Sequence, residues 1–573
     1  MGSGICEVSA RGGFEVVFSE PTAEMVQAGH ERIARSVERA VARGKMPRAD
    51  GDALLDRVSS TVGLEGLSGC DIVFEAVPEH LEIKKKVFAR LDEILGPEAI
   101  LATNTSSLPV IDMAVATKRP DRVLGFHFFN PAQVMKLVEL VYTVATERSV
   151  IDSARIFAQR LGKTPVPCRD RAGFIANLLL FPYLNSGVRM LEGGFAARED
   201  IDAAMQLGAG HPMGPLALLD LIGLDSAYEI CEALWRQFRD TQDAPPSLLK
   251  QYVVAGYLGR KTGRGFYRYE SAESPKMVDA IPEAAGVVSY DIGIVGIVGS
   301  GVMAAGIAQL VAQAGAEVVM RARTSEAADN ARASVKQGLA KAVAAGKLAG
   351  SATEDVLRRV STTLELSDLA EADLVIEAVA EDSEVKKEIF IEIARSTKPD
   401  AILATTTSSR PVVDLAAATD RPDKVLGLHF FNPAPVMKLV EVVRTVATSS
   451  ESEKRVVAWV RSLGKRPVRC RDRAGFIVNF LLFPYLNDAV LMHEQGYSTP
   501  ADIDSAMKLG CGHPMGPFEL MDIVGLDVTH AILNSLHDEF RERRYAPAPL
   551  LEHMVRAGYL GKKSGRGFYE YPG

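Results

Sequence analysis

The sequence predicts a mixed α/β protein made of two tandem halves, each a doubly wound α/β domain followed by an all-helical domain. Three observations predict it: a long internal repeat, short apolar strands alternating with helical stretches early in each repeat, and purely helical spacing late in each repeat. A chain of 573 residues is also too long for a single hydrophobic core, which agrees with several domains.

The repeat is visible when the chain is compared with itself. GFHFFNPAQVMKLVEL around His127 returns as GLHFFNPAPVMKLVEV around His429, a shift of 302 residues. The same shift relates Ser106 to Ser408 and AGYLGRKTGRGFY to AGYLGKKSGRGFY, without an insertion from Met1 onward. Because solenoid repeats run about 20 to 50 residues, this longer repeat is a duplicated unit.

Each half divides into two patterns. Runs such as DIVFEAV, AILATNTSS and RVLGFHFFN alternate with helical stretches, which predicts a parallel sheet with helices on both faces. Between the halves, SAESPKMVDAIPEAAGVVSYD mixes Ser, Pro, Ala and charges without periodicity, as linkers do. The predicted boundaries are residues 1–168 and 290–470 for the α/β domains, 169–270 and 471–573 for the helical domains, and 271–289 for the linker.

Composition and charge exclude several functional classes. Apolar residues make up 47% of the chain and the net charge is −8, which argues against a nucleic-acid surface. No uncharged apolar run approaches the roughly 18 residues of a spanning helix, so no membrane partner is expected. Six cysteines are too few for a disulfide framework, and they predict a reducing, cytoplasmic location. No Cys/His spacing indicates a metal site.

The second half carries a complete dinucleotide-binding pattern. In YDIGIVGIVGSGVMAAGIAQLVAQAGAEVVM, a strand precedes Gly299, Gly301 and Ala304, and a helix and another strand follow. The first glycine permits a tight turn, the second lets the backbone approach a pyrophosphate, and the small third residue lets helix pack on strand. The pyrophosphate would then lie at the helix N-terminus. The alternative is a tight turn in a domain that binds no ligand.

The first half contains only the end of this dinucleotide-binding pattern. Met303 aligns with Met1 and Ala304 with Gly2, so the strand and the first two glycines have no counterpart. That strand is central in a doubly wound sheet, and its absence removes buried side chains worth about 1.5–3 kcal/mol each. Two explanations stay open: a start assigned too late at an internal Met, which we favour, or a damaged domain kept for structure. As the sequence stands, the first half is expected to hold a dinucleotide poorly.

The end of the next strand predicts which dinucleotide is bound. An acidic residue there accepts hydrogen bonds from the ribose hydroxyls of NAD, whereas arginine suits the 2′-phosphate of NADP. The first half has Glu20 at this place, and the second half has Ala322 between Arg321 and Arg323. NAD is therefore the expected cofactor, and the second half is expected to tolerate or prefer NADP unless both arginines are simply solvated.

A His and a Glu recur in each half, twelve residues apart. Oxidising a secondary alcohol by hydride transfer requires a base for the hydroxyl proton, and imidazole is poised near neutral pH. A neighbouring carboxylate fixes the tautomer of the ring and stabilises the imidazolium that forms. His127 with Glu139 and His429 with Glu441 offer that pair, although a His after a strand is also a common structural residue.

An ordered series of motifs makes the prediction more specific. TTTSSRPV, HFFNPAPVMKLVEV, RAGFIVNFLLFPYLN, GHPMGPFELMDIVGLD and GYLGKKSGRGFYEY follow one another in the second half, and close copies follow in the first. The series resembles the L-3-hydroxyacyl-CoA dehydrogenase family, including 3-hydroxybutyryl-CoA dehydrogenases. This resemblance implies a Rossmann-type domain, a helical domain of the 6-phosphogluconate-dehydrogenase C-terminal type, and NAD-linked interconversion of a short 3-hydroxyacyl-CoA and a 3-oxoacyl-CoA.

The resemblance also implies roles for individual residues. His127 and His429 match the catalytic base, and Glu139 and Glu441 match its orienting carboxylate. The other matches are Ser106 and Ser408 for the hydroxyl that bonds the substrate oxygen, Asn177 and Asn479 for the amide beside it, Glu79 with Lys84 and Glu381 with Lys386 for the nicotinamide-side ribose, and Asn104, replaced by Thr406 in the second half, for a cofactor contact.

In this family the helix after the second strand helps to hold CoA. Ser36 and Arg43 match this role in the first half, whereas Gly338 and Ala345 replace them in the second. Lys341 and Lys347 are then the nearby cations. The same helices could be amphipathic packing elements only. Without the missing strand, only the second half is expected to turn over substrate.

Other features complete the expectation. His211 and His513, in GHPMGP, lie at a turn before a helix and are expected to be structural. The two helical domains are expected to pair within the chain, because a large apolar helical face needs a partner, and further homo-oligomerisation stays open. Two alternatives remain: a dehydrogenase of a free hydroxy acid or polyol, since relatives share HFFNP, and a non-enzymatic binding or structural protein.

Overall fold

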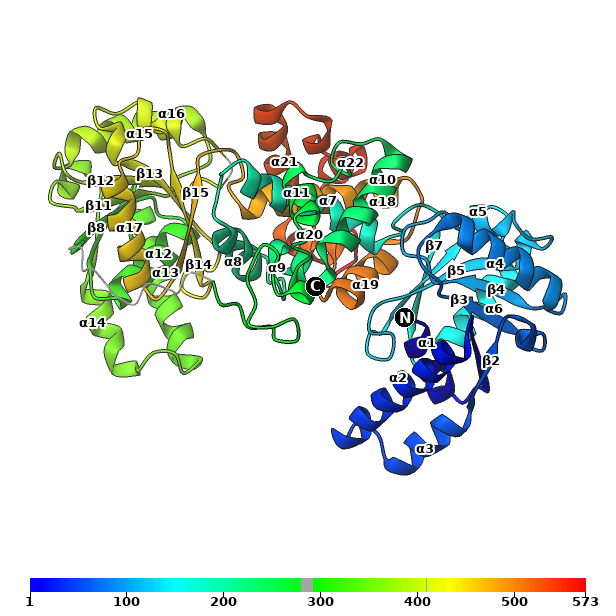
Figure 1. Ribbon diagram of the computed structural model, residues 1–573. Coiled ribbons are helices and arrows are strands. Elements are labelled where there is room, and N and C mark those ends of the chain that lie inside the picture. Colours follow the sequence, from blue (N-terminus) through cyan, green and yellow to red (C-terminus); the bar gives the residue numbers. More distant parts are fainter. Residues whose placement is uncertain (280–291, 409, 573) are drawn as a thin grey trace.

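The computed structural model describes residues 1–279, 292–408 and 410–572. The molecule is elongated, with the two α/β domains at its ends and the two helical domains together in the middle (Figure 1). Residues 280–289 of the predicted linker, and the start of the second half at Tyr290, lie outside the described residues. The predicted domain boundaries stay a prediction.

The second half contains an eight-stranded sheet in the order β10-β9-β8-β11-β12-β13-β14-β15. The sequence predicted a parallel sheet, and this is wrong for β14, which runs antiparallel to β13. The connection between them is too short for the crossover of a dozen or more residues that a parallel pair needs. The strands are β8 (Ile294–Val298), β9 (Glu317–Arg321), β10 (Val360–Thr363), β11 (Leu374–Glu377), β12 (Ile402–Thr405), β13 (Val425–Phe430), β14 (Leu439–Arg444) and β15 (Arg466–Arg471).

Helices cover this sheet, and their ends follow from local sequence. The Thr324 hydroxyl accepts from the Ala327 N–H at the start of α13, and the Asp382 carboxylate accepts from the Glu384 and Val385 N–H groups at the start of α15. The helices are α12 (Val302–Gln313), α13 (Ser325–Ala344), α14 (Thr353–Arg358), α15 (Ser383–Ser396), α16 (Val413–Ala417) and α17 (Ser450–Ser462).

In the first half the corresponding strands form two separate sheets, β1-β2 and β3-β4-β5-β6-β7. In the second half β8 pairs with β9 on one side and β11 on the other. No described residue takes the place of β8 in the first half, so the sheet divides there. The elements are α1 (Gly2–Arg11), β1 (Val16–Glu20), α2 (Ala23–Ala42), α3 (Arg48–Asp56), β2 (Val58–Val62), β3 (Ile72–Glu75), α4 (Leu81–Ile94), β4 (Ile100–Thr103), α5 (Val110–Ala114), β5 (Val123–Phe128), β6 (Leu137–Tyr142), α6 (Arg148–Arg160) and β7 (Thr164–Arg169).

The helical domains share one apolar core, because a single cluster of buried side chains includes both of them. The long helices α7 and α18 pack against each other at its centre. The helices are α7 (Ala176–Glu192), α8 (Arg198–Gly208), α9 (Pro215–Ile222), α10 (Leu224–Phe238), α11 (Ser247–Val254), α18 (Val478–Glu494), α19 (Pro500–Cys511), α20 (Pro517–Val524), α21 (Leu526–Phe540) and α22 (Pro549–Arg556). Short 3-10 helices span Glu65–Leu67, Pro120–Arg122, Arg260–Thr262, Gly350–Ala352, Leu366–Leu369, Pro422–Lys424, Arg543–Tyr545 and Lys562–Ser564.

Each helical domain also packs on the α/β domain of the other half. Helix α8 lies against β14 and β15, and α19 lies against β6 and β7. The Tyr497 hydroxyl donates to the Arg169 carbonyl at 2.6 Å, and the Arg471 N–H donates to the Phe195 carbonyl at 3.1 Å. The two halves are therefore interlocked. Within the described residues, no helix has both the length and the apolar character that crossing a bilayer requires.

Candidate active site

Each half brings a His and a Glu together on neighbouring strands. The antiparallel register sets His127 on β5 opposite Glu139 on β6, and His429 on β13 opposite Glu441 on β14. The His Nδ1 lies 2.7 Å from the Glu Oε2 in the first half and 2.6 Å in the second. Directly opposite residues of an antiparallel pair have Cβ atoms about 4.5–5.5 Å apart. The strand direction missed by the sequence prediction therefore explains why a spacing of twelve residues produces contact.

The carboxylate of each pair is held by a helix N-terminus. Oε1 of Glu441 accepts from the N–H groups of Ile477 and Val478 at 3.0 and 2.9 Å, at the start of α18. Glu441 is fully buried, and such hydrogen bonds together with the helix dipole favour its ionised form. An ionised carboxylate only accepts hydrogen bonds, so Nδ1 of His429 carries the proton. The Nε2 atom of His429 then has a free lone pair, and it contacts no hydrogen-bonding group among the described residues.

The predicted Ser and Asn are joined through the main chain. Asn479, the second residue of α18, donates its side-chain N–H to the Ser408 carbonyl at 2.9 Å. Asn177 donates to the Ser106 carbonyl at 3.2 Å in the same way. The hydroxyls of both serines make no hydrogen bond with the described residues. They are therefore free to bond a ligand.

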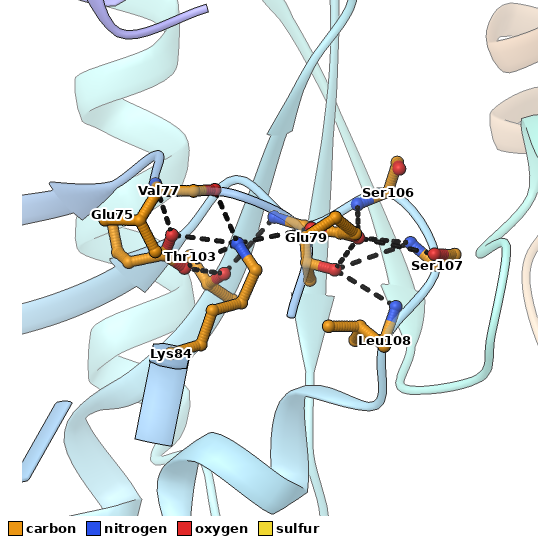
Figure 2. A network of polar contacts seen from close by, with 9 residues as sticks. Glu75, Val77, Glu79, Lys84, Thr103, Ser106, Ser107 and Leu108 are labelled. Atoms are coloured by element: carbon orange, nitrogen blue, oxygen red, sulfur yellow. Dashed lines mark hydrogen bonds and ion pairs between the residues drawn. The ribbon is translucent and has the colours of Figure 1, made fainter. Parts of the chain in front are cut away.

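Glu79, between β3 and α4, fixes the loop that carries Ser106. Its Oε1 accepts from the Thr105 hydroxyl at 2.5 Å and from the N–H groups of Ser106 and Ser107 at 3.0 and 3.3 Å (Figure 2). Its Oε2 lies 3.2 Å from Nζ of Lys84. Burial alone would raise the pKa of Glu79, but Lys84, the Thr105 hydroxyl and the Ser106 N–H outweigh it, and the pKa is lowered. A charged Glu79 thus sets the position of Ser106.

Lys84 lies behind Glu79 and is almost completely buried. Its Nζ is 2.8 Å from Oε1 of Glu75, whose other oxygen accepts from the Thr103 hydroxyl at 2.7 Å (Figure 2). Only 1% of the Lys84 side chain is exposed, which favours a positioning role over the direct ribose contact that the resemblance implied. Sequence reasoning missed Glu75 and Thr103, although a carboxylate at the end of an apolar strand needs such a partner. The second-half counterparts are Lys386, Glu377 and Thr405.

The second half departs from this arrangement at Arg410, which stands where the first half has Leu108. Arg410 donates to the Ser383 hydroxyl at 2.6 Å and to the Glu381 carbonyl at 3.3 Å. The Glu381 carboxylate accepts from the Thr407 hydroxyl and, at 3.2 Å, from the Ser408 N–H. Burial would raise the pKa of Glu381, but Lys386 and these donors lower it. Arg410 is thus an additional cation beside the predicted ribose site.

Asn104 and Thr406 also differ in their contacts. The Asn104 side-chain oxygen accepts from the Phe128 N–H at 2.9 Å and so ties the end of β4 to the end of β5. The Thr406 side chain makes no such bond to the described residues, and only its N–H is used, donating to the Glu377 carbonyl at 2.9 Å. The loop of the second half lacks this tie.

The predicted dinucleotide loop of the second half has the geometry of a phosphate cradle. Gly299 has φ +140°, and a Cβ there would lie 2.4 Å from the Ala378 carbonyl oxygen. Gly301 directly precedes α12, and no side chain caps the start of this helix. A Cβ added at Gly301 would meet no atom within 4 Å. Ala304 is fully buried under the sheet. The free N–H groups of α12 and the open approach over Gly301 fit a dinucleotide pyrophosphate.

The residues predicted to select the ribose lie at the ends of β1 and β9. Arg321 ends β9, where its Nε donates to the Leu364 carbonyl at 3.3 Å, and Arg323 is exposed just beyond it. Glu20 ends β1 and lies 3.7 Å from Arg32. The structure therefore brings both arginines to the same edge of the sheet as Gly299 and Gly301.

Comparison with known proteins decides the family. The 3-hydroxyacyl-CoA dehydrogenase NAD-binding domain matches residues 1–171 and 294–473, and the C-terminal domain of the same family matches residues 173–269 and 475–571. The chain belongs to the 3-hydroxyacyl-CoA dehydrogenase family. Each of the two domains occurs twice, so the duplicated organisation predicted from the sequence is confirmed. The protein is an NAD-dependent dehydrogenase with a Rossmann-type domain and a helical domain in each half.

Individual members of the family match over one half or over the whole chain. A 3-hydroxybutyryl-CoA dehydrogenase of Mycobacterium tuberculosis (strain ATCC 25618 / H37Rv) is 49% identical over 271 residues, 47% of this chain and 95% of that protein. A probable 3-hydroxybutyryl-CoA dehydrogenase of Deinococcus radiodurans is 44% identical over 276 residues, 48% of this chain and 99% of that protein. The crystal structure of 3-hydroxybutyryl-CoA dehydrogenase from Escherichia coli K12 shares 26% identity at a TM-score of 0.71 and covers 98% of this chain and 97% of that chain.

The residues that the family resemblance assigned to CoA are only partly brought together. In the first half a cavity of about 520 Å³ is lined by Ser36, whose hydroxyl accepts from the Gln133 side chain at 3.2 Å. Arg43 caps the end of α2 and does not line this cavity. Three other arginines of α2 line the cavity, namely Arg32, Arg35 and Arg39. Sequence reasoning missed them, although residues three, four and seven positions apart lie on the same face of a helix.

The second half has a different surface at this place. Gly338 makes room for Gln309, because a Cβ at Gly338 would lie 2.1 Å from the Gln309 side-chain oxygen. Lys341 lies near the end of α13 and Lys347 beyond it, and neither forms an ion pair with the described residues. The predicted structural histidines, His211 and His513, stack on each other where the two helical domains meet.

Proposed function

We propose that this dehydrogenase interconverts an L-3-hydroxyacyl-CoA and the corresponding 3-oxoacyl-CoA, with a short substrate such as 3-hydroxybutyryl-CoA. The observation that carries the proposal is the His429–Glu441 pair, at 2.6 Å, in the half that also has the complete glycine loop at Gly299 and Gly301. The names of the relatives, 3-hydroxybutyryl-CoA dehydrogenases at 44–49% identity, support the substrate class.

The chemistry follows from the protonation of His429. Its free Nε2 removes the proton of the C3 hydroxyl, and Glu441 holds the Nδ1 proton and stabilises the resulting imidazolium. Bound NAD would accept the hydride that leaves C3, and the carbon–oxygen bond becomes the carbonyl of the product. In the reverse direction the His429 imidazolium returns the proton to the carbonyl oxygen.

The remaining site residues bind and orient. The Ser408 hydroxyl and the Asn479 amide are proposed to hold the substrate oxygen, and Glu381 fixes the Ser408 main chain. The first turn of α12, with Gly299 and Gly301, would hold the pyrophosphate. In the first half His127, Glu139, Ser106 and Asn177 are arranged alike, but the loop that would hold the pyrophosphate has no counterpart among the described residues.

The test is NADH formation from 3-hydroxybutyryl-CoA, followed at 340 nm. His429→Ala is expected to lower kcat by about 10²–10⁴-fold, the range of general-base catalysis, with NADH affinity kept. His553→Ala, on the exposed face of α22, is the matched control and is expected to keep full turnover. Full turnover by His429→Ala would contradict the proposal.

The alternative substrate class gives a different result in the same assay. A dehydrogenase of free hydroxy acids or polyols would oxidise 3-hydroxybutyrate or gulonate as fast as the CoA ester.

We further propose that the second half accepts NADP as well as NAD. The support is the pair Arg321 and Arg323 at the end of β9, where the first half has Glu20. Replacing both arginines with Ala is expected to lower kcat/KM for NADP at least tenfold and to change kcat/KM for NAD little. Equal losses with both cofactors would contradict it.

A cytoplasmic location is also proposed. All six cysteines are free thiols, as expected in a reducing compartment. Homo-oligomerisation beyond the pairing of the helical domains stays a prediction, and sedimentation of the full chain would measure it.

A further inference from the structure

A segment of the first half docks on the second half beside its candidate active site. Helix α7 ends at Glu192, and shortly after it Ala196 forms an antiparallel bridge with Cys470 near the end of β15. The Arg471 N–H donates to the Phe195 carbonyl at 3.1 Å. Phe195, only 8% exposed, is thereby fixed against the stretch of chain that leads from β15 into α18.

Arg473, in that stretch, lies between two aromatic rings. Its guanidinium carbon is 3.8 Å from the centroid of the Phe195 ring and 3.6 Å from that of the Phe480 ring on α18. Burial lowers the pKa of Arg473 to about 10, so the side chain is still a cation at neutral pH and is attracted to both rings. Its Nε and Nη2 atoms are buried without a hydrogen-bond partner among the described residues. The two rings, rather than hydrogen bonds from these atoms, therefore hold the guanidinium.

The turn between Arg473 and α18 is strained at Phe476. This residue has a φ of +48°, a left-handed conformation that is rare for a large side chain. Such a conformation persists only when the surroundings fix it. Besides the contact of Arg473 with the two rings, the turn is held by two hydrogen bonds: the Arg473 carbonyl accepts from the Phe476 N–H at 3.3 Å, and the Ala474 N–H donates to the Glu539 side chain at 3.1 Å.

The same turn contacts both members of the His–Glu pair. Phe476 is fully buried, and the centroid of its ring lies 5.7 Å from that of the His429 imidazole. The next two N–H groups, those of Ile477 and Val478, donate to Oε1 of Glu441. A shift of the turn would therefore move the ring beside His429 and the donors to Glu441 together.

We propose that Phe195 of the first half is a positioning residue for the candidate active site of the second half, acting through Arg473 on the start of α18. The Phe195 ring holds the guanidinium, the guanidinium fixes the strained turn, and the turn places Glu441 and His429. The effect on catalysis rests on the proposed function, whereas the coupling of Phe195 to the turn does not.

The first half offers a matched control on the other side of the interface. Arg171, the counterpart of Arg473, lies 5.2 Å from the centroid of the Tyr497 ring and donates to the Gln495 side chain at 2.8 Å. Tyr497 is the counterpart of Phe195 and is equally buried, at 2% exposed. A substitution of Tyr497 therefore disturbs the same kind of interface at the turn of the first half.

The experiment measures oxidation of 3-hydroxybutyryl-CoA by the full chain carrying His127→Ala, so that only the second half contributes to turnover. Phe195→Leu is expected to lower kcat by about 10–10²-fold, because a misplacement of about 1 Å can cost about 10²-fold. KM, NADH affinity and the thermal midpoint are expected to change little. Phe195→Tyr, which keeps the aromatic face, and Tyr497→Leu, the matched control, are both expected to keep kcat.

Two further measurements separate positioning from a general loss of stability. Amide hydrogen exchange at Ile477 and Val478 is expected to become about tenfold faster in Phe195→Leu and not in Tyr497→Leu, and this readout does not need turnover. Arg473→Met is expected to lower kcat as much as Phe195→Leu does. The double variant should lose no more than either single variant, because both substitutions remove one contact.

The outcomes separate this proposal from the proposed function. A lower kcat together with faster exchange in Phe195→Leu alone supports it. A change in only one of the two measurements, additive losses in the double variant, or equal changes in Tyr497→Leu overturn it. If the unchanged protein does not oxidise the CoA ester, the proposed function fails, and the exchange measurement then decides whether Phe195 is coupled to the turn.

Discussion

At the residue scale, the chemistry depends on which atoms of His429 and Glu441 face each other. One Glu441 oxygen accepts from two N–H groups at the start of α18 and the other pairs with Nδ1 of His429, which leaves Nε2 free to act as the proposed base. The base is therefore set by contacts from β13, β14 and α18 together. Neither residue alone indicates this role.

Glu441→Gln tests this arrangement. The amide keeps the size of the side chain but no longer enforces the Nδ1-protonated tautomer, so kcat should fall by about 10²–10⁴-fold while NADH affinity stays. The measurement is the rate of NADH formation at saturating 3-hydroxybutyryl-CoA. Glu451→Gln, an exposed carboxylate on α17, is the control, and undiminished turnover by Glu441→Gln would argue against an orienting carboxylate.

Glu381→Gln tests the loop that carries Ser408. Because the pKa of Glu381 is lowered below its ordinary value of 4.5, its charged form stabilises the fold above that pH, and the contribution is lost as pH falls through the lowered pKa. At pH 7 the variant should be less stable by about 1–3 kcal/mol and should turn over more slowly. Urea unfolding at pH 7 and pH 4 measures it: the difference from the unchanged protein should shrink at pH 4, and a constant difference would contradict the assignment.

At the scale of single elements, the β8–α12 turn shows what a glycine pattern specifies. Gly299 needs its positive φ and its missing Cβ because of the Ala378 carbonyl, whereas Gly301 has open space around the place of its Cβ. Only Gly299 is therefore required by the fold. Gly301 fits the proposed approach of the dinucleotide, since the fold itself leaves room for a Cβ there.

The two glycines should thus respond differently to alanine. Gly299→Ala is expected to lower both the thermal midpoint and NADH affinity, the latter at least tenfold, because the new Cβ meets main chain in a strained conformation. Gly301→Ala is expected to keep the midpoint and to lose only NADH affinity. Calorimetry and NADH titration distinguish the two, and a destabilised Gly301→Ala would refute the ligand explanation.

At the scale of the whole molecule, the pairing of the helical domains buries a pair of histidines. The rings of His211 and His513 stack with centroids 4.1 Å apart, and each Nδ1 lies near a hydroxyl, that of Tyr183 at 3.2 Å or Tyr485 at 3.3 Å. Burial lowers the pKa of His211 to about 4, and burial together with His211 lowers that of His513 to about 3. Both rings are therefore neutral in the folded protein at neutral pH, in agreement with a structural role.

This pair predicts a loss of stability in mild acid. Unfolded histidines take up protons below about pH 6.5 and the buried ones do not, so the free energy of unfolding falls as pH falls from 6.5 toward 4. The contribution reaches up to about 2 kcal/mol per ring at pH 5. Replacing both histidines with Gln should flatten the change in urea midpoint between pH 7 and pH 5, and the exposed His553→Gln should not. An unchanged slope in the double variant would show that the pair does not titrate this way.

The interlocked halves also couple sites that are far apart in the sequence. Arg473, just ahead of α18, stacks between Phe195 of the first half, at 3.8 Å, and Phe480, at 3.6 Å. The next turn supplies the N–H groups that hold Glu441. The first helical domain thus packs beside the candidate active site of the second half.

The sequence by itself determined the duplication, the glycine loop and the residue types of the site. Repeated motifs and a strand–glycine turn–helix pattern can be recognised from residues that are close together along the chain, without information on distant contacts. Tertiary structure decided the rest. It set His429 against Glu441 through an antiparallel strand pair, buried Lys84 behind Glu79, and packed each helical domain onto the α/β domain of the opposite half. Each of these depends on which segments meet in space, and that is fixed by long-range packing and pairing of elements, which periodicity along the chain does not record.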